Sequence, residues 1–363
     1  MILITPRITT LKEISRPPML HRMTSSERRK APLWPRLALL GLTGASLVSL
    51  IGIQFGPISL LTHFQLYFSA AWAVALLAMR MAPSIRGAFW RPQRIMALGA
   101  AFFLGHVLCV ASLWLPPSDP ELEKPDEVDI VWFNAMHREG ALRTLESRLA
   151  EDPPDILCIG EIDPRTRVQL EGYPFQLRSP KHDLLIVSRL PLEFGNLTPV
   201  PGGGRDQLTA RVRIGRRHFR IMAVHFRQPV YPSHYAEVRR AAALANEEED
   251  VILVGDLNTT AWAGQFRQLC READFQHGRQ GRGVMDTWAI GEGRWVPLPI
   301  DHMLYKGAIA CTDFRLLEWT RSDHRPLRGT FLIGGKRGRK FQGDDLGVEQ
   351  VGHGDTQDAG EGP

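Results

Sequence analysis

The first 115 residues contain three apolar runs with the length of membrane-spanning helices. They cover residues 37–53, 60–79 and 95–115, and none of them contains Asp, Glu, Lys or Arg. Each is close to the roughly 20 residues that an α-helix needs to cross a bilayer. A core helix of a soluble protein would carry a polar stripe at helical spacing, whereas these runs show only scattered Ser, Thr, His and Gln. The pattern predicts a three-span membrane anchor at 37–115, with the lipid bilayer as its partner.

Basic residues flank these runs unevenly. The leader at 1–36 holds eight basic residues and two acidic ones, the 80–94 loop holds four arginines, and the 54–59 connection is uncharged. The segment after the third run, "SDPELEKPDEVD", is acidic. Because basic loops stay in the cytoplasm, we expect a multi-pass protein of a bacterial inner membrane with a cytoplasmic N-terminus and a periplasmic or extracytoplasmic C-terminal domain. The net charge of +5 comes largely from the leader, so it is poor evidence for a nucleic-acid partner.

Beyond the anchor, the pattern changes to that of a soluble domain. Residues 116–127 are rich in Pro and acidic residues and read as a linker, and residues 334–363 hold too few apolar side chains to fold, which predicts a disordered tail. Between them, residues 128–333 contain short β-branched apolar stretches bounded by Pro, Gly or charge, which is typical of buried strands.

Helical patterns alternate with these strands. Residues 141–151, 233–248 and 262–274 have helical periodicity, and residues 205–227 read as two strands around a glycine turn. Strands that alternate with helices predict an α/β domain, and the hairpin adds antiparallel pairing. We therefore expect a mixed sheet or two packed sheets.

Polar residues stand where the predicted strands end. The stretch "VILVGDLNTT" runs through four apolar residues and then places Asp256 and Asn258 two positions apart. A strand covered on both faces can first present polar groups to solvent where it leaves the sheet, so such residues from several strands can share one pocket. The other strand ends and starts hold the following polar residues: Asn134, Glu161, Ser188, Arg189, His225, Asp323 and His324.

Carboxylates, carboxamides and histidines suit one kind of chemistry. Oxygen ligands favour a hard divalent cation, Mg²⁺ or Mn²⁺, and neighbouring histidines can exchange protons with a phosphate-bound oxygen. This set indicates metal-assisted hydrolysis of a phosphoester. The four cysteines lack the close paired spacing of a zinc site. A bond between Cys270 and Cys311 and a pair of free buried thiols are both open readings.

The motifs "WFN", "CIGEID", "LLIVSRLPL", "MAVHFRQP", "VGDLNTT", "PIDHMLY" and "RSDHRPL", in that order, resemble the endonuclease/exonuclease/phosphatase superfamily, which includes DNase I. The resemblance covers about residues 128–332, and its most specific part is "GDLN" followed by "SDHRP". It implies a four-layer α/β/β/α sandwich of two mixed β-sheets with the active site at one edge.

The resemblance also implies roles for individual residues. Glu161 would be the principal metal carboxylate, with Asn134 and Asp323 close to the metal and the phosphate. Asp256 would orient or deprotonate the attacking water, and Asn258 would hold a phosphate oxygen. In the same comparison, His324, paired with Asp301, would contact the scissile phosphate, and His225 would be a second phosphate contact or proton donor. We also expect Arg189 to bind substrate phosphate.

Three further features bear on the interpretation. DNA-repair members often have Asp two residues after the "WN" asparagine, and this chain has Met136 there. The glycine-rich "PGGGRDQ" lacks the Gly-Lys-Ser/Thr ending of a nucleotide-binding loop, so we interpret it as a connection. Arg205 and the Arg239–Arg240 pair could contact substrate, but such residues are more often solvated.

The leading hypothesis is a membrane-anchored, divalent-metal-dependent phosphoesterase that acts on a phosphodiester or phosphomonoester in nucleic acid or a phospholipid headgroup by in-line attack of water. The alternative is a non-catalytic membrane sensor or scaffold that retains the fold.

Overall fold

The computed structural model describes residues 33–52, 56–179, 183–289 and 295–336. The chain forms two compact units: the first comprises residues up to Ile51 together with Phe64–Leu108, and the second comprises Gly52–His63 and the chain from Cys109 onward. The leader at 1–32 and the tail at 337–363 lie outside the described residues. We refer below to the first as the anchor unit and to the second as the catalytic unit, after the roles that the sequence predicts for them.

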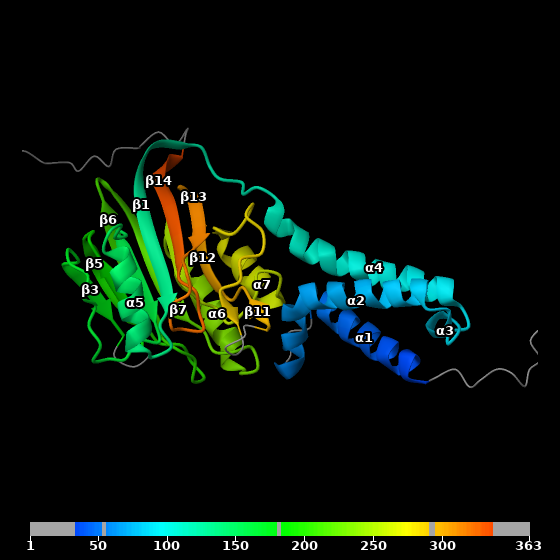
Figure 1. Cartoon of the computed structure of the whole chain (residues 1–363). Coiled ribbons are helices and arrows are strands. Elements are labelled where there is room, and N and C mark those ends of the chain that lie inside the picture. The colour runs from blue at the N-terminus through cyan, green and yellow to red at the C-terminus, as the bar shows by residue number, and fades with distance from the viewer. Residues whose placement is uncertain (1–32, 53–55, 180–182, 290–294, 337–363) are drawn as a thin grey trace, which may run out of the picture. The chain divides into compact units, whose positions relative to one another are not determined.

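The anchor unit is helical (Figure 1). Its helices are α1 (Trp34–Ile51), α2 (Gln65–Met81), α3 (Pro83–Arg86) and α4 (Pro92–Ala111). Three segments are long and apolar enough to cross a membrane, namely Trp34–Ile51, Gly56–Met81 and Pro92–Trp114. They coincide with the three predicted spans to within a few residues.

The exposed and the buried side chains of these helices differ in polarity, as expected for candidate membrane spans. Large apolar side chains such as Leu40 and Val74 are exposed, while polar side chains face the other helices. The Trp72 indole donates a hydrogen bond to Ser46 Oγ over 2.8 Å, which joins α2 to α1. Polar contacts of this kind join helices in an apolar solvent, where polar side chains have no water to bind.

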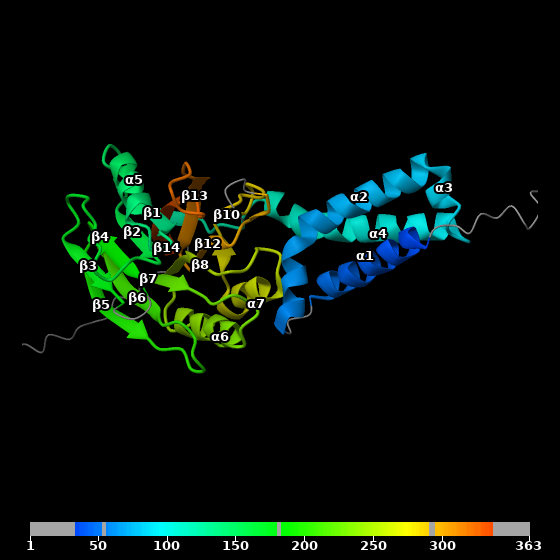
Figure 2. The same cartoon turned by 60° about the horizontal axis from the view of Figure 1, so that its bottom comes forward.

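Two six-stranded mixed sheets form the core of the catalytic unit (Figures 1 and 2). The first sheet has the order β13-β14-β1-β2-β4-β3 and contains β1 (Leu122–Asn134), β2 (Ile156–Gly160), β3 (Phe175–Arg178), β4 (Leu185–Ser188), β13 (Ile309–Leu316) and β14 (Leu327–Lys336). The second has the order β5-β6-β7-β8-β12-β9 and contains β5 (Leu192–Thr198), β6 (Gln207–Ile214), β7 (Arg217–His225), β8 (Val251–Asp256), β9 (Gln276–His277) and β12 (Asp301–Lys306). A two-stranded sheet pairs β10 (Trp288–Ala289) with β11 (Pro297–Leu298).

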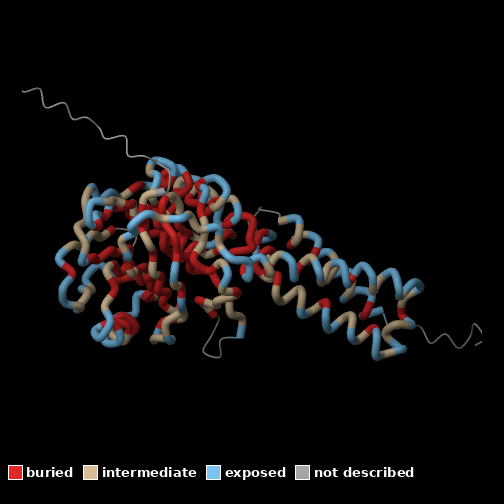
Figure 3. The backbone as a smooth tube through the Cα atoms, turned by 90° about the horizontal axis from the view of Figure 1, so that it is seen from above, coloured by how far each residue is buried: buried red, intermediate tan, exposed pale blue. Residues whose placement is uncertain are grey.

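Helices cover the outer faces of both sheets. Helix α5 (Glu139–Leu149) packs Leu142 and Leu145 against the first sheet, and α6 (Ser233–Ala245) and α7 (Gly264–Ala273) lie on the side of the second sheet. The largest apolar cluster lies between the two sheets and includes Ile130, Ile186 and Ile221. Figure 3 shows this buried interior in red. The predicted four-layer α/β/β/α sandwich is confirmed.

Local patterns located most elements within a few residues. The three helical patterns correspond to α5, α6 and α7, and the pair of strands in 205–227 is β6 and β7, which turn at Gly215 with a φ of 56°. Strand β1 begins at Leu122, so residues 122–127, which read as linker in the sequence, are paired with β14. Strand β14 extends to Lys336, three residues past the predicted end of the domain. All four cysteines are free thiols.

Candidate active site

Strand register brings the predicted polar residues to one edge of the two sheets. In the second sheet, Asp256 at the end of β8 lies beside His225 at the end of parallel β7 and beside Asp301 at the start of antiparallel β12. In the first sheet, Asn134 ends β1 and Glu161 directly follows β2, which is parallel to β1. We call this edge the site edge.

Asn134 links the two sheets at the site edge. Its Nδ2 donates to Glu161 Oε1 and to Asp256 Oδ2, over 3.2 Å in each case. Its Oδ1 accepts the backbone N–H of Met136 over 3.0 Å, which fixes the orientation of the amide group. A single carboxamide thereby holds one carboxylate from each sheet.

The loop that follows β8 has an unusual backbone. Asn258 has a φ of 49°, a left-handed conformation that non-glycine residues seldom adopt. Its N–H donates to Asp256 Oδ1 over 2.8 Å, and its Nδ2 donates to the carbonyl oxygen of Phe226 over 2.9 Å. Glu161 also has a positive φ, 49°. Such strain persists only where surrounding contacts hold it, and it is concentrated at functional sites.

His324 and Asp301 form a buried pair. The ring Nδ1 of His324 lies 2.8 Å from Asp301 Oδ2, and its Nε2 lies 3.8 Å from Asp256 Oδ2. The other oxygen of Asp301 accepts the indole N–H of Trp132 over 2.8 Å. The Trp132 ring in turn lies so close to Gly160 that a Cβ at that position would be 2.6 Å from it. Trp132 therefore connects the strand that precedes Glu161 to the carboxylate that orients His324.

Burial and neighbouring charges shift the pKa values in this cluster. Burial, and then the Asp301 carboxylate, raise the pKa of Asp256 to about 7. Burial by itself lowers the pKa of His324, but the Asp301 and Asp256 carboxylates outweigh it and raise that pKa to about 9. Burial and the Arg205 guanidinium lower the pKa of His225 well below its usual value. Opposite shifts of neighbouring groups are typical of catalytic sites.

The arrangement suits a divalent cation. Two groups of potential ligands meet here, Glu161 with His225 and Asp256, and Asp256 with Asp301 and His324, and the ligand atoms of each group lie within 4.8 Å of one another. Asp323 Oδ1 is buried and has no hydrogen-bond partner among the described residues, while its Oδ2 accepts from Trp288 over 2.9 Å. That free oxygen lies 4.0 Å from the Nε2 of His324, a member of the second group. Carboxylate oxygens are ligands for a hard cation, so the residues present fit a divalent metal ion.

Arg189 is the one predicted site residue that lies elsewhere. Strand β4 runs antiparallel to β2, so its last residue, Ser188, pairs with Ile156 at the start of β2. The N–H of Arg189 donates to the carbonyl oxygen of Asp155, just before β2. The prediction for Arg189 is therefore wrong: the end of β4 lies at the opposite edge of the first sheet, which we call the far edge.

Three residues at the site edge were not among the predicted site residues. Arg205 contacts the Nε2 of His225, and because a guanidinium can only donate, that Nε2 is the acceptor. His137 Nε2 lies 3.8 Å from Glu161 Oε2, and Ser322 Oγ donates to the carbonyl oxygen of Asn134 over 2.8 Å. His137 and Ser322 stand within three residues of predicted metal ligands, and this closeness in the sequence could have identified them as site residues. Nothing in the local sequence distinguished Arg205 from a solvated arginine.

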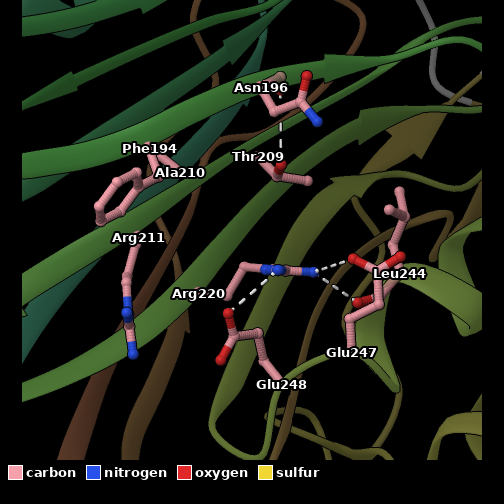
Figure 4. A pocket seen from close by; sticks show the side chains of 9 residues that line it. All are labelled: Phe194, Asn196, Thr209, Ala210, Arg211, Arg220, Leu244, Glu247 and Glu248. Carbon is pink, nitrogen blue, oxygen red and sulfur yellow. Dashed lines mark hydrogen bonds and ion pairs between the residues drawn. The ribbon is translucent and has the colours of Figure 1, made fainter.

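A separate hollow of about 320 Å³ lies on the second sheet. Its lining includes Phe194, Arg211 and Arg220, and Figure 4 shows the Arg220 guanidinium beside Glu247 and Glu248. Arg220 lies 2.9 Å from Glu247 and 3.1 Å from Glu248, so its charge is already balanced. None of the predicted site residues lines this hollow.

The chain matches the Endonuclease/Exonuclease/phosphatase family over residues 131–324, more than half of its 363 residues. The protein belongs to this family. The match begins within β1 and ends at His324, so it includes the whole of the site edge described above. Enzymes of the kinds that the family is named for hydrolyse phosphate esters, which supports a hydrolase function for this chain.

Three solved structures are similar to this chain at low sequence identity. A humanized TDP2 from D. rerio is 17% identical with a TM-score of 0.48, and the similarity covers 56% of this chain and 98% of that one. The 3'-5' exonuclease NExo from Neisseria meningitidis is 20% identical with a TM-score of 0.44, over 55% and 98% of the two chains. A family protein from Bacteroides thetaiotaomicron is 10% identical with a TM-score of 0.49, over 59% and 97%. No curated protein matches the chain.

Proposed function

We propose that this protein is a membrane-anchored, divalent-metal-dependent phosphoesterase that hydrolyses a phosphodiester or phosphomonoester by in-line attack of water. The observation that carries the proposal is the position of Asp256. Its carboxylate lies between Asn134, which also holds Glu161, and the His324–Asp301 pair. A water molecule and a phosphate placed at this edge would meet a base, a cation site and a histidine together.

The family resemblance and the geometry together suggest a role for each residue. Asp256 orients the attacking water and accepts its proton, and Asn258 holds a phosphate oxygen. His324, held by Asp301, and His225 contact the phosphate. Glu161 and Asp323 would hold Mg²⁺ or Mn²⁺, with the Asn134 amide orienting Glu161, and the ion when bound would polarise a phosphate oxygen and stabilise the charge that develops on it.

The anchor supports a location at a bacterial inner membrane with the catalytic unit on the periplasmic side. The segment Gly52–His63 belongs to the catalytic unit, and it is joined to the rest of that unit through the candidate spans Gly56–Met81, which starts within the segment, and Pro92–Trp114, which ends beyond Cys109. The second and third spans together return the chain to the side of the membrane on which the first span ended. Three spans therefore agree with the assignment of Gly52–His63 and the chain after Cys109 to one unit. The basic loops then favour a cytoplasmic N-terminus. A reporter fused after residue 336 tests the side: alkaline phosphatase, which folds only in the periplasm, should be active, and an inactive fusion would reverse the orientation.

The substrate class, nucleic acid or phospholipid headgroup, stays open in this proposal. A nuclease needs basic residues along a groove to neutralise the phosphate backbone. A lipid phosphoesterase gains from being tethered near its substrate. A panel of single-stranded DNA, RNA and phospholipid vesicles, assayed with the purified full chain and Mg²⁺ or Mn²⁺, separates these classes.

The central test uses isosteric variants at the site edge. The full chain in detergent should hydrolyse bis(p-nitrophenyl) phosphate or p-nitrophenyl phosphate when Mg²⁺ or Mn²⁺ is present. Asp256→Asn and His324→Gln should each lower kcat on the order of 10²- to 10⁴-fold, since each removes a proton-transfer group. Arg189→Ala, at the far edge, is the matched control and should retain activity. Full activity in both site variants would refute the assignment.

A folded wild-type chain that hydrolyses none of the phosphoesters in the panel would instead favour a sensor or scaffold that retains the fold. Calorimetric titration of Mn²⁺ into the wild-type chain then shows whether the ligand set still binds a cation.

A further inference from the structure

The second candidate span, Gly56–Met81, begins with a short helix, η1 (Gly56–Phe64), whose residues up to His63 belong to the catalytic unit. Ser59, Thr62 and His63 of this helix are buried, although Thr62 and His63 lie inside the apolar run 60–79. Ser59 and Thr62 use their hydroxyl groups locally, donating to the carbonyl oxygens of Gly56 and Ser59, respectively, over 2.7 Å in each case. His63 differs, because its contacts reach the loop that carries the candidate catalytic residues.

Two groups of His63 contact that loop, namely its ring Nδ1 and its backbone carbonyl oxygen. Its Nδ1 accepts the backbone N–H of Thr260 over 3.2 Å and lies 3.3 Å from the Thr260 hydroxyl. Its carbonyl oxygen accepts the indole N–H of Trp262 over 3.0 Å. Thr260 and Trp262 are buried as well. A buried donor without an acceptor is costly, so these bonds hold the loop where it is.

The loop that His63 holds is the one that begins with Asp256 and Asn258. On its other side, His302 Nε2 lies 2.7 Å from the carbonyl oxygen of Thr259, and the N–H of Leu257 donates to Ile300 over 3.0 Å. The loop is therefore fixed by β12 on one side and by His63 on the other. Of these two supports, the contact with His63 is the one from a segment more than 190 positions away from Thr260 in the sequence.

We propose that His63 is a positioning residue for the site: it fixes residues 256–260 and makes the start of the second candidate span a structural part of the catalytic unit. This inference rests on the proposed function where it concerns catalysis. It implies that residues 116–334 alone lack one of the contacts that hold the catalytic loop. The segment Gly56–His63 thereby contributes to the geometry of the site.

The test compares three variants of the full chain in detergent. His63→Asn keeps an acceptor, because the Asn amide oxygen can take the place of Nδ1. His63→Leu keeps the bulk and removes the acceptor. Thr62→Val removes a buried hydroxyl of the same segment that does not contact the loop, and it is the matched control.

Two readouts are measured for each variant. We expect His63→Leu to lower kcat on the order of 10-fold with little change in KM. The variant leaves the buried N–H of Thr260 without its acceptor, and a loss of about 1.4 kcal/mol corresponds to a tenfold change. Amide hydrogen exchange in the peptide that spans residues 257–263 should accelerate by a similar factor. His63→Asn should restore both values toward the wild type, and Thr62→Val should change neither.

Several results would overturn the proposal. Exchange and kcat in His63→Leu that match Thr62→Val would show that His63 does not hold the loop. Failure of His63→Asn to restore either value, with equal losses of thermal stability in both His63 variants, would reduce His63 to a packing residue. If the wild type hydrolyses no phosphoester, the proposed function fails, and the exchange measurement alone still decides whether His63 fixes the loop.

Discussion

The two edges of the catalytic unit use similar residue types in opposite ways. At the far edge each acid has a partner: Arg328 contacts Asp129 and lies 2.8 Å from Asp152, and the N–H of Asp129 donates to Asp155 over 2.9 Å. At the site edge, Asp256 lies beside Asp301, and burial together with that neighbour raises its pKa to about 7. Paired charges stabilise the fold, whereas buried like charges cost free energy and are retained where chemistry needs them.

The largest effect that would separate the edges is expected from Asp301→Asn. The single amide oxygen can accept from Trp132, which leaves the amide NH2 to face His324 Nδ1, so the ring loses its orienting charge. We expect kcat to fall on the order of 10²- to 10⁴-fold while the protein stays folded. Steady-state kinetics and circular dichroism measure the two properties. Unchanged kcat would show that the pair is structural.

Arg328→Met tests the far edge and should have the opposite signature. It leaves Asp129 and Asp152 without their guanidinium and should lower the free energy of unfolding by about 1–3 kcal/mol. Activity per folded molecule should be unchanged. Denaturant unfolding of the full chain in detergent, with kinetics at a temperature well below the midpoint, checks both. A fall in kcat of the folded variant would mean that the edges are coupled.

Gly160→Ala probes the contact that joins Trp132 to the strand before Glu161. The added Cβ would lie 2.6 Å from the indole, so the ring or the strand must move. We expect a loss of about 1–3 kcal/mol in the free energy of unfolding and a lower kcat, because the indole also holds Asp301. Gly335→Ala, where a Cβ meets nothing within 4 Å, is the control. Equal behaviour of the two variants would argue against the contact.

Lowering the pH should destabilise the catalytic unit through His234, a residue of α6 outside both edges. His234 is buried, with its Nδ1–H donated to the carbonyl oxygen of Arg227 over 2.7 Å. Burial lowers its pKa from 6.5 to about 4, so between these values the unfolded chain binds the proton more readily. The contribution of neutral His234 is therefore present above about pH 6.5 and is lost as the pH falls toward 4. Its slope is about 1.4 kcal/mol per pH unit.

His234→Asn checks this titration, because the amide keeps a donor for Arg227 and cannot be protonated. Unfolding midpoints measured between pH 7 and pH 4.5 should decline less steeply in the variant than in the wild type. Identical slopes would assign the acid sensitivity to other groups.

The smallest effect is expected at the hollow on the second sheet. Arg211→Ala changes an exposed side chain of its lining, remote from the site edge. We expect hydrolysis to be unaffected within about twofold, because surface substitutions away from a site seldom matter. A marked loss with one substrate of the panel alone would give the hollow a role in binding that substrate.

The ends of buried strands indicated most residues of the candidate site. Asn134, His225 and Asp256 are the last residues of their strands, Glu161 follows β2, Asp301 is the first residue of β12, and His324 stands three residues before β14. All of these lie at the site edge. Arg189 failed because β4 is antiparallel to β2. An apolar stretch shows that a strand is buried, but its direction depends on pairing with strands elsewhere in the chain.

The sequence by itself determined the three apolar helices, the alternation of buried strands with helices, and the kinds of side chain available to the site. These properties are local, since periodicity and polarity are set by neighbouring residues. Tertiary structure decided that Trp132 reaches Asp301, that Arg205 contacts His225, and that His63 holds the loop after β8. Such contacts join positions far apart in the chain, and only the packing of the two sheets and their connections brings those positions within hydrogen-bond distance.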